Sequence, residues 1–302
     1  MAQRLSAPQS GQRVGSMAEV EGMGALGQSG SFMQQAMLVS KPLPKSCCFT
    51  ALVRDMTSPS SWPWTLLIAG IVVLALLTVS GCTVWRMGQA GDLARRSEPL
   101  QHTPASPALR LLIVGDSTAV GTGASSPQTS LAGLLAREYP RLRIENRARD
   151  GAKFDDVAMQ LGGTERHDLV LIQAGGNDVI RMRDMDAVGA DIDRVLTLAK
   201  ARADRVILMP AGNVGNAPFF YPPVSWWMSS RARTMHALVR EATQRHGAVY
   251  VNLYKDKASD PFAQQPELNA ADGLHPSDAG YRVWFTELMS QAALAPVLAP
   301  AR

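Results

Sequence analysis

The sequence predicts an α/β protein in which a parallel five-stranded sheet lies between layers of helices and follows one N-terminal membrane segment. Two observations support this prediction. After residue 108, short runs that are apolar on both faces alternate five times with segments of helical periodicity, as expected for buried parallel strands joined by helices. Before that point, a run of 18 residues carries no charge, which is typical of a membrane-inserted helix.

The uncharged run is Trp62–Val79, and its two tryptophans at one end suit the lipid headgroup zone. A buried core helix would show a polar stripe, and none is visible. Two interpretations stay open: a permanent transmembrane anchor, or the apolar part of a signal peptide. The run Val79-Ser-Gly-Cys82 resembles a bacterial lipobox, in which Cys82 would be lipidated. Either interpretation places the rest of the chain outside the cytoplasm, on the periplasmic side of the inner membrane or as a lipoprotein.

Composition divides the chain into segments. Residues 1–61 are rich in Gly, Ser, Gln, Met and Pro without periodicity, so we expect a disordered tail. We expect a transmembrane anchor or lipoprotein-type signal at 62–82, a linker at 83–108, the folded domain at 109–295 and a C-terminal tail at 296–302.

Charge and cysteine content exclude several functions. From residue 108 onward there are 22 Lys and Arg against 21 Asp and Glu, so the folded part has no broad positive field to attract nucleic acid. The cysteines are Cys47, Cys48 and Cys82, so the folded part contains no disulfide and no thiol nucleophile.

The apolar and periodic segments set the expected elements. The expected strands are 109–114, 142–146, 169–174, 206–209 and 249–253. The expected helices are 131–138, 154–161, 185–201, 231–245 and 277–292. Ligands of such sheets bind at the carboxyl ends of the strands, and several of the polar motifs described next follow strand ends.

The first motif is Gly115-Asp116-Ser117, directly after the first strand. A serine there projects from the sheet edge, beside backbone N–H groups that can hold an oxyanion. The alternative is a serine that caps a helix. Thr118 and Ala119 follow, so the Gly-x-Ser-x-Gly elbow of α/β-hydrolases is absent.

Near the other end lies Asp272-Gly-Leu-His275-Pro276. Histidine suits general base catalysis near neutral pH, and a carboxylate three residues away can orient its ring. The alternative is a local surface hydrogen bond. A metal site of Asp116, Asp178, Asp272 and His275 would lack a recognisable ligand spacing, so we expect no metal.

Two further motifs follow the second and third strands. Gly151, after Asn146, allows the backbone to approach a ligand closely, although an ordinary turn explains it equally. In Gly175-Gly176-Asn177-Asp178, the Asn177 amide can donate to developing negative charge, or Asn177 can serve the turn alone.

Together these four motifs resemble the SGNH/GDSL hydrolase family over about residues 109–292, through Ser117, Gly151, Asn177 and His275. The motif that follows the second strand is the loosest match, since only Asn146 and Gly151 agree with the family. The resemblance implies a three-layer α/β/α, flavodoxin-like fold. It also implies a nucleophile at Ser117, a base at His275 oriented by Asp272, and an oxyanion hole formed by the Ser117 and Gly151 N–H groups and the Asn177 side chain.

The expected function is therefore serine-dependent hydrolysis of a small-molecule, lipid or glycan ester by a membrane-tethered monomer that needs no cofactor and binds no nucleic acid. The alternatives are a carbohydrate O-acetyl esterase or acyltransferase acting on cell-envelope glycans, and a non-catalytic binding domain on the same fold.

Five aromatic side chains crowd residues 212–230, after the fourth strand. Three of them, Phe219, Phe220 and Trp227, are candidates for a wall along an acyl chain. A segment that dips into the membrane and simple packing onto the domain are the alternatives.

Overall fold

The computed structural model describes residues 62–299, so the expected tail at 1–61, with Cys47 and Cys48, lies outside the described residues. Five parallel strands form one sheet in the order β2-β1-β3-β4-β5, which confirms the predicted fold class. The strands are β1 (Leu109–Gly115), β2 (Leu142–Asn146), β3 (Leu169–Gln173), β4 (Arg205–Leu208) and β5 (Val249–Tyr250).

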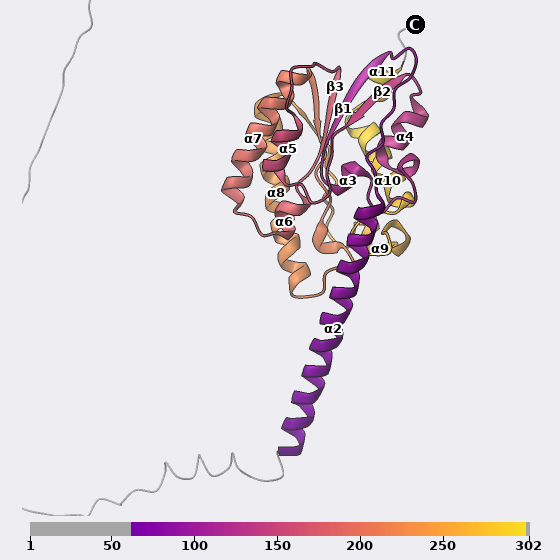
Figure 1. The fold of residues 1–302 in the computed structure, drawn as a ribbon. Helices are drawn as coiled ribbons and strands as arrows, with labels where there is room; N and C mark the ends of the chain where they lie inside the picture. The colour runs from indigo at the N-terminus through magenta and orange to yellow at the C-terminus, as the bar shows by residue number, and fades with distance from the viewer. Residues whose placement is uncertain (1–61, 300–302) are drawn as a thin grey trace, which may run out of the picture. The chain divides into compact units, whose positions relative to one another are not determined.

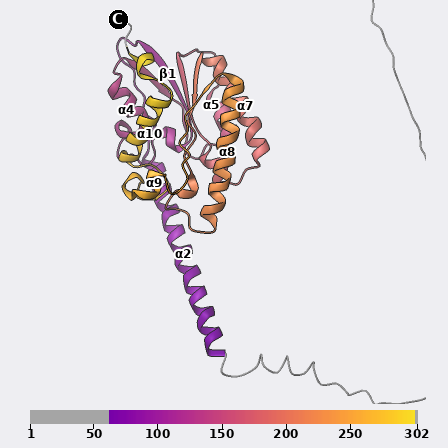
Figure 2. The ribbon, with the colours of Figure 1, turned by 180° about the vertical axis from the view of Figure 1, so that it is seen from behind.

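Helices cover both faces of the sheet, as Figures 1 and 2 show from opposite sides. One face carries α4 (Leu131–Glu138) and α10 (Asp278–Gln291). The other carries α5 (Phe154–Gln160), α7 (Met185–Arg202) and α8 (Val224–His246). Short helices complete the described fold: α3 (Ser117–Val120), α6 (Gly176–Ile180), α9 (Pro261–Gln264) and α11 (Ala295–Leu298).

The central strand β1 shows why its sequence forms a buried strand. Leu111 and Ile113 pack into the core beneath α4 and α10. Leu112 and Val114 pack into the core beneath α5, α7 and α8. Because successive side chains of a strand point to opposite faces, a strand covered on both faces must be apolar throughout.

The apolar segment forms α2 (Trp62–Arg96), a helix of 35 residues with no buried side chain. Among the described residues it is the helix long and apolar enough to cross a membrane, which indicates a membrane anchor or a signal sequence. Its helical structure continues beyond the expected boundary at residue 82, because no proline interrupts the chain until Pro99.

The chain on either side of the domain also packs against it. Gln101 exchanges side-chain hydrogen bonds with the backbone N–H and C=O of Asn146, and His102 pairs with Ile144 of the edge strand β2. The second half of the expected linker therefore lies along the sheet. At the other end, Leu298 of α11 is buried, so packing extends beyond the expected boundary at residue 295.

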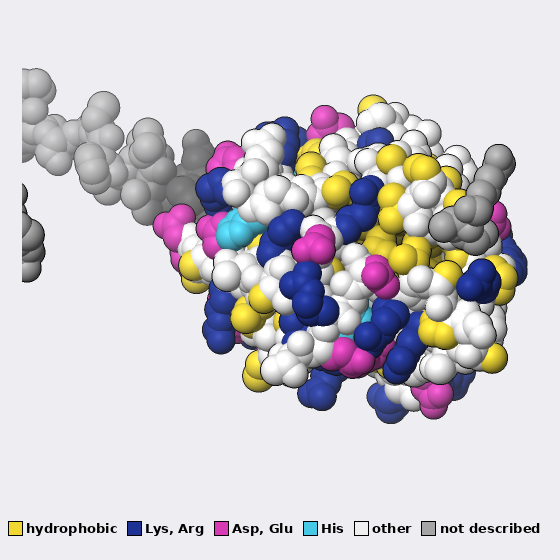
Figure 3. Space-filling view, turned by 90° about the horizontal axis from the view of Figure 1, so that it is seen from above, with side chains coloured by type: hydrophobic (Ala, Val, Ile, Leu, Met, Phe, Trp, Pro, Cys, Tyr) yellow, Lys and Arg dark blue, Asp and Glu magenta, His cyan; other side chains and the backbone are white. Residues whose placement is uncertain are grey.

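The strand order places a site at the carboxyl ends of β1 and β3. From β1 the chain moves outward to β2, and then crosses to β3 on the other side of β1. The loops after β1 and β3 therefore diverge and leave a crevice, where ligands of open parallel sheets bind. Figure 3 looks onto the opposite, amino edge, where Lys and Arg side chains are interspersed with Asp and Glu.

Candidate active site

Ser117 follows a sharp turn at the end of β1. Gly115 has a φ of +149°, and a Cβ atom there would lie 1.9 Å from the carbonyl oxygen of Gln173, so the turn requires glycine. The buried side chain of Gln160 accepts a hydrogen bond from the Gly115 N–H at 2.7 Å and donates one to the Gly115 carbonyl at 2.9 Å. These contacts fix the backbone two residues before Ser117.

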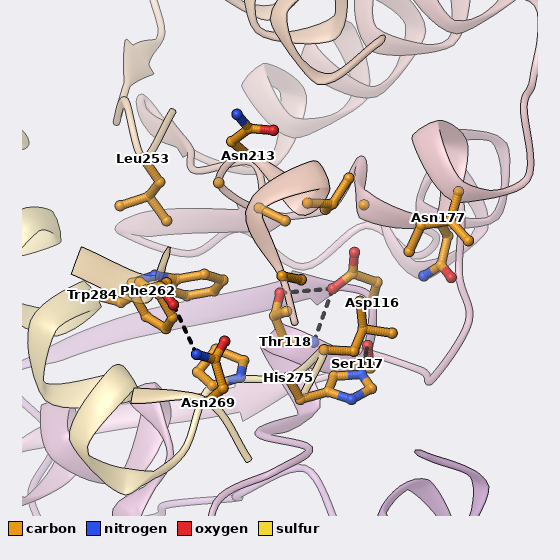
Figure 4. Close-up of a pocket in the computed structure, with 18 of the residues that line it drawn as sticks. Asp116, Ser117, Thr118, Asn177, Asn213, Leu253, Phe262, Asn269, His275 and Trp284 are labelled. Carbon is orange, nitrogen blue, oxygen red and sulfur yellow. Dashed lines mark hydrogen bonds between the residues drawn. The ribbon is translucent and has the colours of Figure 1, made fainter. Parts of the chain in front are cut away.

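Asp116 caps the short helix α3. One of its carboxylate oxygens accepts hydrogen bonds from the Thr118 N–H at 2.9 Å and the Thr118 hydroxyl at 2.7 Å. Figure 4 shows these two bonds beside Ser117. Burial raises the pKa of Asp116 from 3.8 to about 6, although the hydrogen bonds from Thr118 oppose the shift.

Ser117, His275 and Asp272 form a chain of hydrogen bonds. His275 Nε2 lies 2.9 Å from Ser117 Oγ, and His275 Nδ1 lies 2.6 Å from Asp272 Oδ2. A carboxylate can only accept, so Nδ1 carries the proton and Nε2 is free to accept from the serine hydroxyl. All three residues are at least nine-tenths buried. The structure thus brings together residues from opposite ends of the domain.

Asp272 is held as a carboxylate. Burial alone would raise its pKa, but hydrogen bonds from the His275 ring and from the backbone N–H groups of Leu274 and His275 lower the pKa below its ordinary value. An ionised Asp272 fixes the orientation of the His275 ring.

The other two predicted residues lie at the same cavity. Gly151 has a φ of +74°, in the left-handed region that favours glycine, and both it and Asn177 line the cavity beside Ser117. In Figure 4, Asn177 lies on one side of Ser117. Its side-chain NH₂ donates one hydrogen bond to the Ala152 carbonyl at 3.1 Å, which leaves a second N–H on the same nitrogen. Within residues 62–299, neither the Ser117 nor the Gly151 backbone N–H has a hydrogen-bond acceptor.

Buried polar side chains hold the loops that carry these groups. Asn146 donates to the Ala119 carbonyl and accepts from the Ala148 N–H, which joins the loop after β2 to α3. Asp178 accepts from the Phe154 N–H and pairs with Arg183 at 2.9 Å, which joins the loop after β3 to α5.

The cavity extends from Ser117 over an apolar surface and has a volume of about 200 Å³. Leu253, Phe262 and Trp284 line it on the side of Ser117 away from Asn177 (Figure 4). Sequence analysis did not select these residues. Trp284 belongs to a correctly predicted helix and Phe262 follows Asp260-Pro261, a helix-start signal, but neither signal indicates a cavity.

The three aromatic residues selected from the sequence lie elsewhere. Phe219, Phe220 and Trp227 are not part of the cavity lining. The rings of Phe219 and Phe220 pack edge to face, with centroids 5.0 Å apart, and the Phe219 N–H donates to the Gly273 carbonyl. Trp227 is 51% exposed and lies in the first turns of α8, which begins within the segment expected to be a loop.

A metal-like grouping occurs away from the cavity lining. In the described part of the chain, Glu145, Glu165 and His167 form a group of three His and carboxylate side chains, with donor atoms that all lie within 4.8 Å of one another. Arg147 and Arg110 already pair with the two glutamates. The set of Asp116, Asp178, Asp272 and His275 does not form such a group among the described residues.

A profile of the GDSL-like lipase/acylhydrolase family matches residues 113–283, which is more than half of the chain. The chain belongs to this family. GDSL family membership supports ester hydrolysis and agrees with the resemblance predicted from the sequence motifs. A comparison with curated proteins finds no match.

Solved structures align with most of this chain. The protein TesA aligns with 63% of this chain and 99% of its own at a TM-score of 0.50 and 20% identity. A lipase/acylhydrolase from Enterococcus faecalis aligns with 64% of this chain and 99% of its own at a TM-score of 0.48 and 20% identity. Axe2, an acetylxylan esterase from Geobacillus stearothermophilus, aligns with 63% of this chain and 96% of its own at a TM-score of 0.43 and 21% identity.

Proposed function

We propose that this GDSL family member is a serine-dependent carboxylic ester hydrolase that uses Ser117, His275 and Asp272 as a catalytic triad. The observation that supports this proposal best is the continuous chain of hydrogen bonds from Ser117 Oγ through the His275 ring to Asp272, beside a cavity. A nucleophile, a base and a group that orients the base are the parts that acyl transfer to serine needs.

In the proposed acylation step, Ser117 Oγ attacks the ester carbonyl carbon while His275 Nε2 takes the hydroxyl proton. The tetrahedral intermediate collapses when Nε2–H returns this proton to the leaving alcohol, which leaves an ester on Ser117. A water molecule then gives a proton to Nε2 and attacks the acyl carbon. Ser117 regains the proton as the acid leaves, so the enzyme is restored.

We propose that three N–H groups stabilise the negative oxygen of the intermediate: the backbone N–H of Ser117, the backbone N–H of Gly151 and the second side-chain N–H of Asn177. All three residues line the cavity, which supports this role. Donors aimed at the charge that develops in the transition state are the largest single contribution in many such sites.

The test is hydrolysis of p-nitrophenyl acetate and butyrate by the full chain in detergent, with wild type beside Ser117→Ala and with EDTA present. We expect turnover that EDTA does not change and that falls by at least about 10³-fold in Ser117→Ala. Turnover that survives in a folded Ser117→Ala variant would contradict the triad. No turnover by folded wild type on any ester would favour a binding domain on this fold.

A second proposal concerns location: the domain lies outside the cytoplasm and is held at a membrane by α2 or by a lipid on Cys82. The exposed apolar α2 and the run Val79-Ser-Gly-Cys82 support it. Cell fractionation, mass measurement and fatty-acid labelling of wild type and Cys82→Ala distinguish the two anchors. Lipid label that is lost in Cys82→Ala identifies a lipoprotein, whereas unchanged mass and labelling identify α2 as the anchor.

A further inference from the structure

Tryptophan residues occur at two levels along the axis of α2. Trp62 and Trp64 begin the apolar run Trp62–Val79, and Trp85 lies six residues beyond it, directly before Arg86, the first charged residue of α2. Trp62 and Trp85 are 23 residues apart, which at about 1.5 Å per residue is about 35 Å. A bilayer has a hydrocarbon core of about 30 Å and favours tryptophan at both of its surfaces. Trp85 is therefore at the level of the second headgroup zone.

Outside α2, exposed large apolar side chains concentrate at one place. Tyr221, Val224, Trp226 and Trp227, which we call the aromatic edge, are 37%, 43%, 70% and 51% exposed. Trp226 is the most exposed aromatic side chain of the described domain outside α2. The aromatic edge comprises the end of the segment before α8 and the first turn of that helix, at the carboxyl edge of the sheet (Figure 1).

Contacts hold the aromatic edge at the level of Trp85. The Tyr221 hydroxyl lies 3.9 Å from Cys82 Sγ, and the Arg86 guanidinium lies 5.4 Å from the centre of the Tyr221 ring. Arg86 also donates a hydrogen bond to the Pro218 carbonyl. Cys82 is three residues beyond the uncharged run, or about 5 Å along the axis.

We propose that the aromatic edge rests in the headgroup zone of the membrane to which the chain is attached, so that the Ser117 cavity faces that membrane and takes ester substrates held at its surface. Tyrosine and tryptophan suit this zone because one part of each ring system is apolar and the other carries a polar N–H or O–H. Arg86 adds a cation that phosphate headgroups attract.

The position of the cavity supports the second half of the proposal. Its lining includes Ala94 of α2 and Ala217, four residues before Tyr221. The cavity, α2 and the aromatic edge therefore meet at the carboxyl edge of the sheet. The opposite edge carries mixed charges (Figure 3), which suits water rather than lipid. The inference rests on the proposed membrane attachment, and its substrate half also rests on the proposed ester chemistry.

The first test measures membrane depth and needs no activity. The full chain, with Cys47→Ser, Cys48→Ser and Cys82→Ser, is labelled with an environment-sensitive dye at Trp226→Cys and reconstituted singly into phosphatidylcholine–phosphatidylglycerol nanodiscs. Lipids with a nitroxide near the headgroup then quench the dye. The matched control is Asp204→Cys at the amino edge, because the Asp204 side chain is 97% exposed. We expect several-fold stronger quenching at 226 than at 204.

Other results would overturn the proposal in distinguishable ways. Equal, weak quenching at 226 and 204, with strong quenching of a dye at Leu74→Cys, would reject the aromatic edge but keep the anchor. Weak quenching at Leu74→Cys as well would reject insertion of α2 into the membrane and this inference with it. Cross-linking between two chains through residue 226 would show that a second copy covers the edge instead.

A second test concerns the substrate. We expect the double variant Trp226→Ser, Trp227→Ser to lose roughly tenfold in hydrolysis of a long-chain ester carried in vesicles, about 1.4 kcal/mol, and to keep wild-type hydrolysis of soluble p-nitrophenyl acetate. Met159→Ser is the control, since Met159 is 72% exposed near the end of α5 that faces the amino edge. Equal losses on both substrates would reject the membrane-facing cavity.

Discussion

The side chain of Gln160, at the end of α5, forms hydrogen bonds with both the N–H and the C=O of Gly115, at the end of β1. Each of these atoms is buried, and Gly115 stands two residues before Ser117. Gln160 therefore acts as a positioning residue for the serine: it fixes the backbone turn from which the side chain of Ser117 projects.

We expect Gln160→Leu to lower both stability and turnover. The buried Gly115 N–H loses its side-chain partner, whereas the Gly115 carbonyl keeps the Arg149 N–H, so the cost is about 1–3 kcal/mol of unfolding free energy. A shifted Ser117 should lower kcat by roughly tenfold or more while KM changes little. Gln160→Glu keeps the acceptor for the Gly115 N–H but places a buried carboxylate against the Gly115 carbonyl, so its losses should be at least as large as those of Gln160→Leu.

The control for Gln160→Leu and Gln160→Glu is Gln244→Leu, because Gln244 is exposed on α8. Thermal unfolding and steady-state kinetics are measured for all three variants. A Gln160→Leu protein that is less stable but keeps the wild-type kcat would show that Gln160 supports the fold without positioning Ser117.

Asn177 provides a test of oxyanion stabilisation. We expect Asn177→Ala to lower kcat by about 10²–10³-fold with a small change in KM, because the lost N–H acts mainly on the transition state. Asn177→Asp has nearly the same shape but replaces donors by a negative charge, so its loss should be at least as large. The measurements are kcat and KM on p-nitrophenyl butyrate, beside thermal midpoints. A rise in KM alone would assign Asn177 to substrate binding.

The strands were predictable because each buried parallel strand is a short apolar run. Ser117 and Asn177 were predictable because their motifs come directly after such runs, β1 and β3. The start of α8 was not. Pro222-Pro223 and the aromatic residues after it are typical of a loop, but proline is tolerated where a helix begins, and α8 starts at Val224.

The cavity wall depends on packing that no local pattern records. Phe262 and Trp284 are 145 and 167 residues after Ser117, and they meet at the cavity only because α9 and α10 pack near the end of β1. Gln160 was equally hidden, since a glutamine in the last turn of an amphipathic helix is usually exposed. The motifs therefore predicted the hydrogen-bonded residues, and the tertiary structure added their supports and the apolar wall.

Ionisation of Asp116 makes the free energy of unfolding depend on pH, and the direction of this dependence follows from its raised pKa. Its pKa is about 6 in the fold and 3.8 in the unfolded chain, so between these values the folded state holds a proton that the unfolded state releases. The contribution of Asp116 is therefore most favourable below about pH 4 and is lost as the pH rises to about 6. A shift of about two units corresponds to roughly 3 kcal/mol.

We expect Asp116→Asn to remove this dependence, because the amide keeps an acceptor for Thr118 but does not ionise. The variant should gain stability over wild type as the pH rises from 4 to 7, by up to roughly 3 kcal/mol. Chemical unfolding at the two pH values measures the difference, with Asp204→Asn as an exposed control. A difference between Asp116→Asn and wild type that is the same at pH 4 and pH 7 would contradict the buried, protonated Asp116.

Trp284 lines the apolar part of the cavity. Trp284 is 7% exposed, and its ring packs against Phe262 with centroids 5.9 Å apart. We expect Trp284→Leu to leave room for additional methylene groups, each worth about 0.8 kcal/mol when buried. The ratio of kcat/KM for p-nitrophenyl octanoate over acetate should therefore rise by roughly tenfold, even if the variant is less stable.

Trp227→Leu is the matched control, because Trp227 stands outside the cavity lining. It should leave the chain-length ratio for soluble esters unchanged. The two variants also decide between two positions for the acyl chain. If Trp227→Leu shifts the ratio and Trp284→Leu does not, the acyl chain lies along the aromatic residues that follow β4 rather than in the cavity beside Phe262. A kcat/KM ratio is the right measure because reduced folding of a variant lowers both rates equally and cancels.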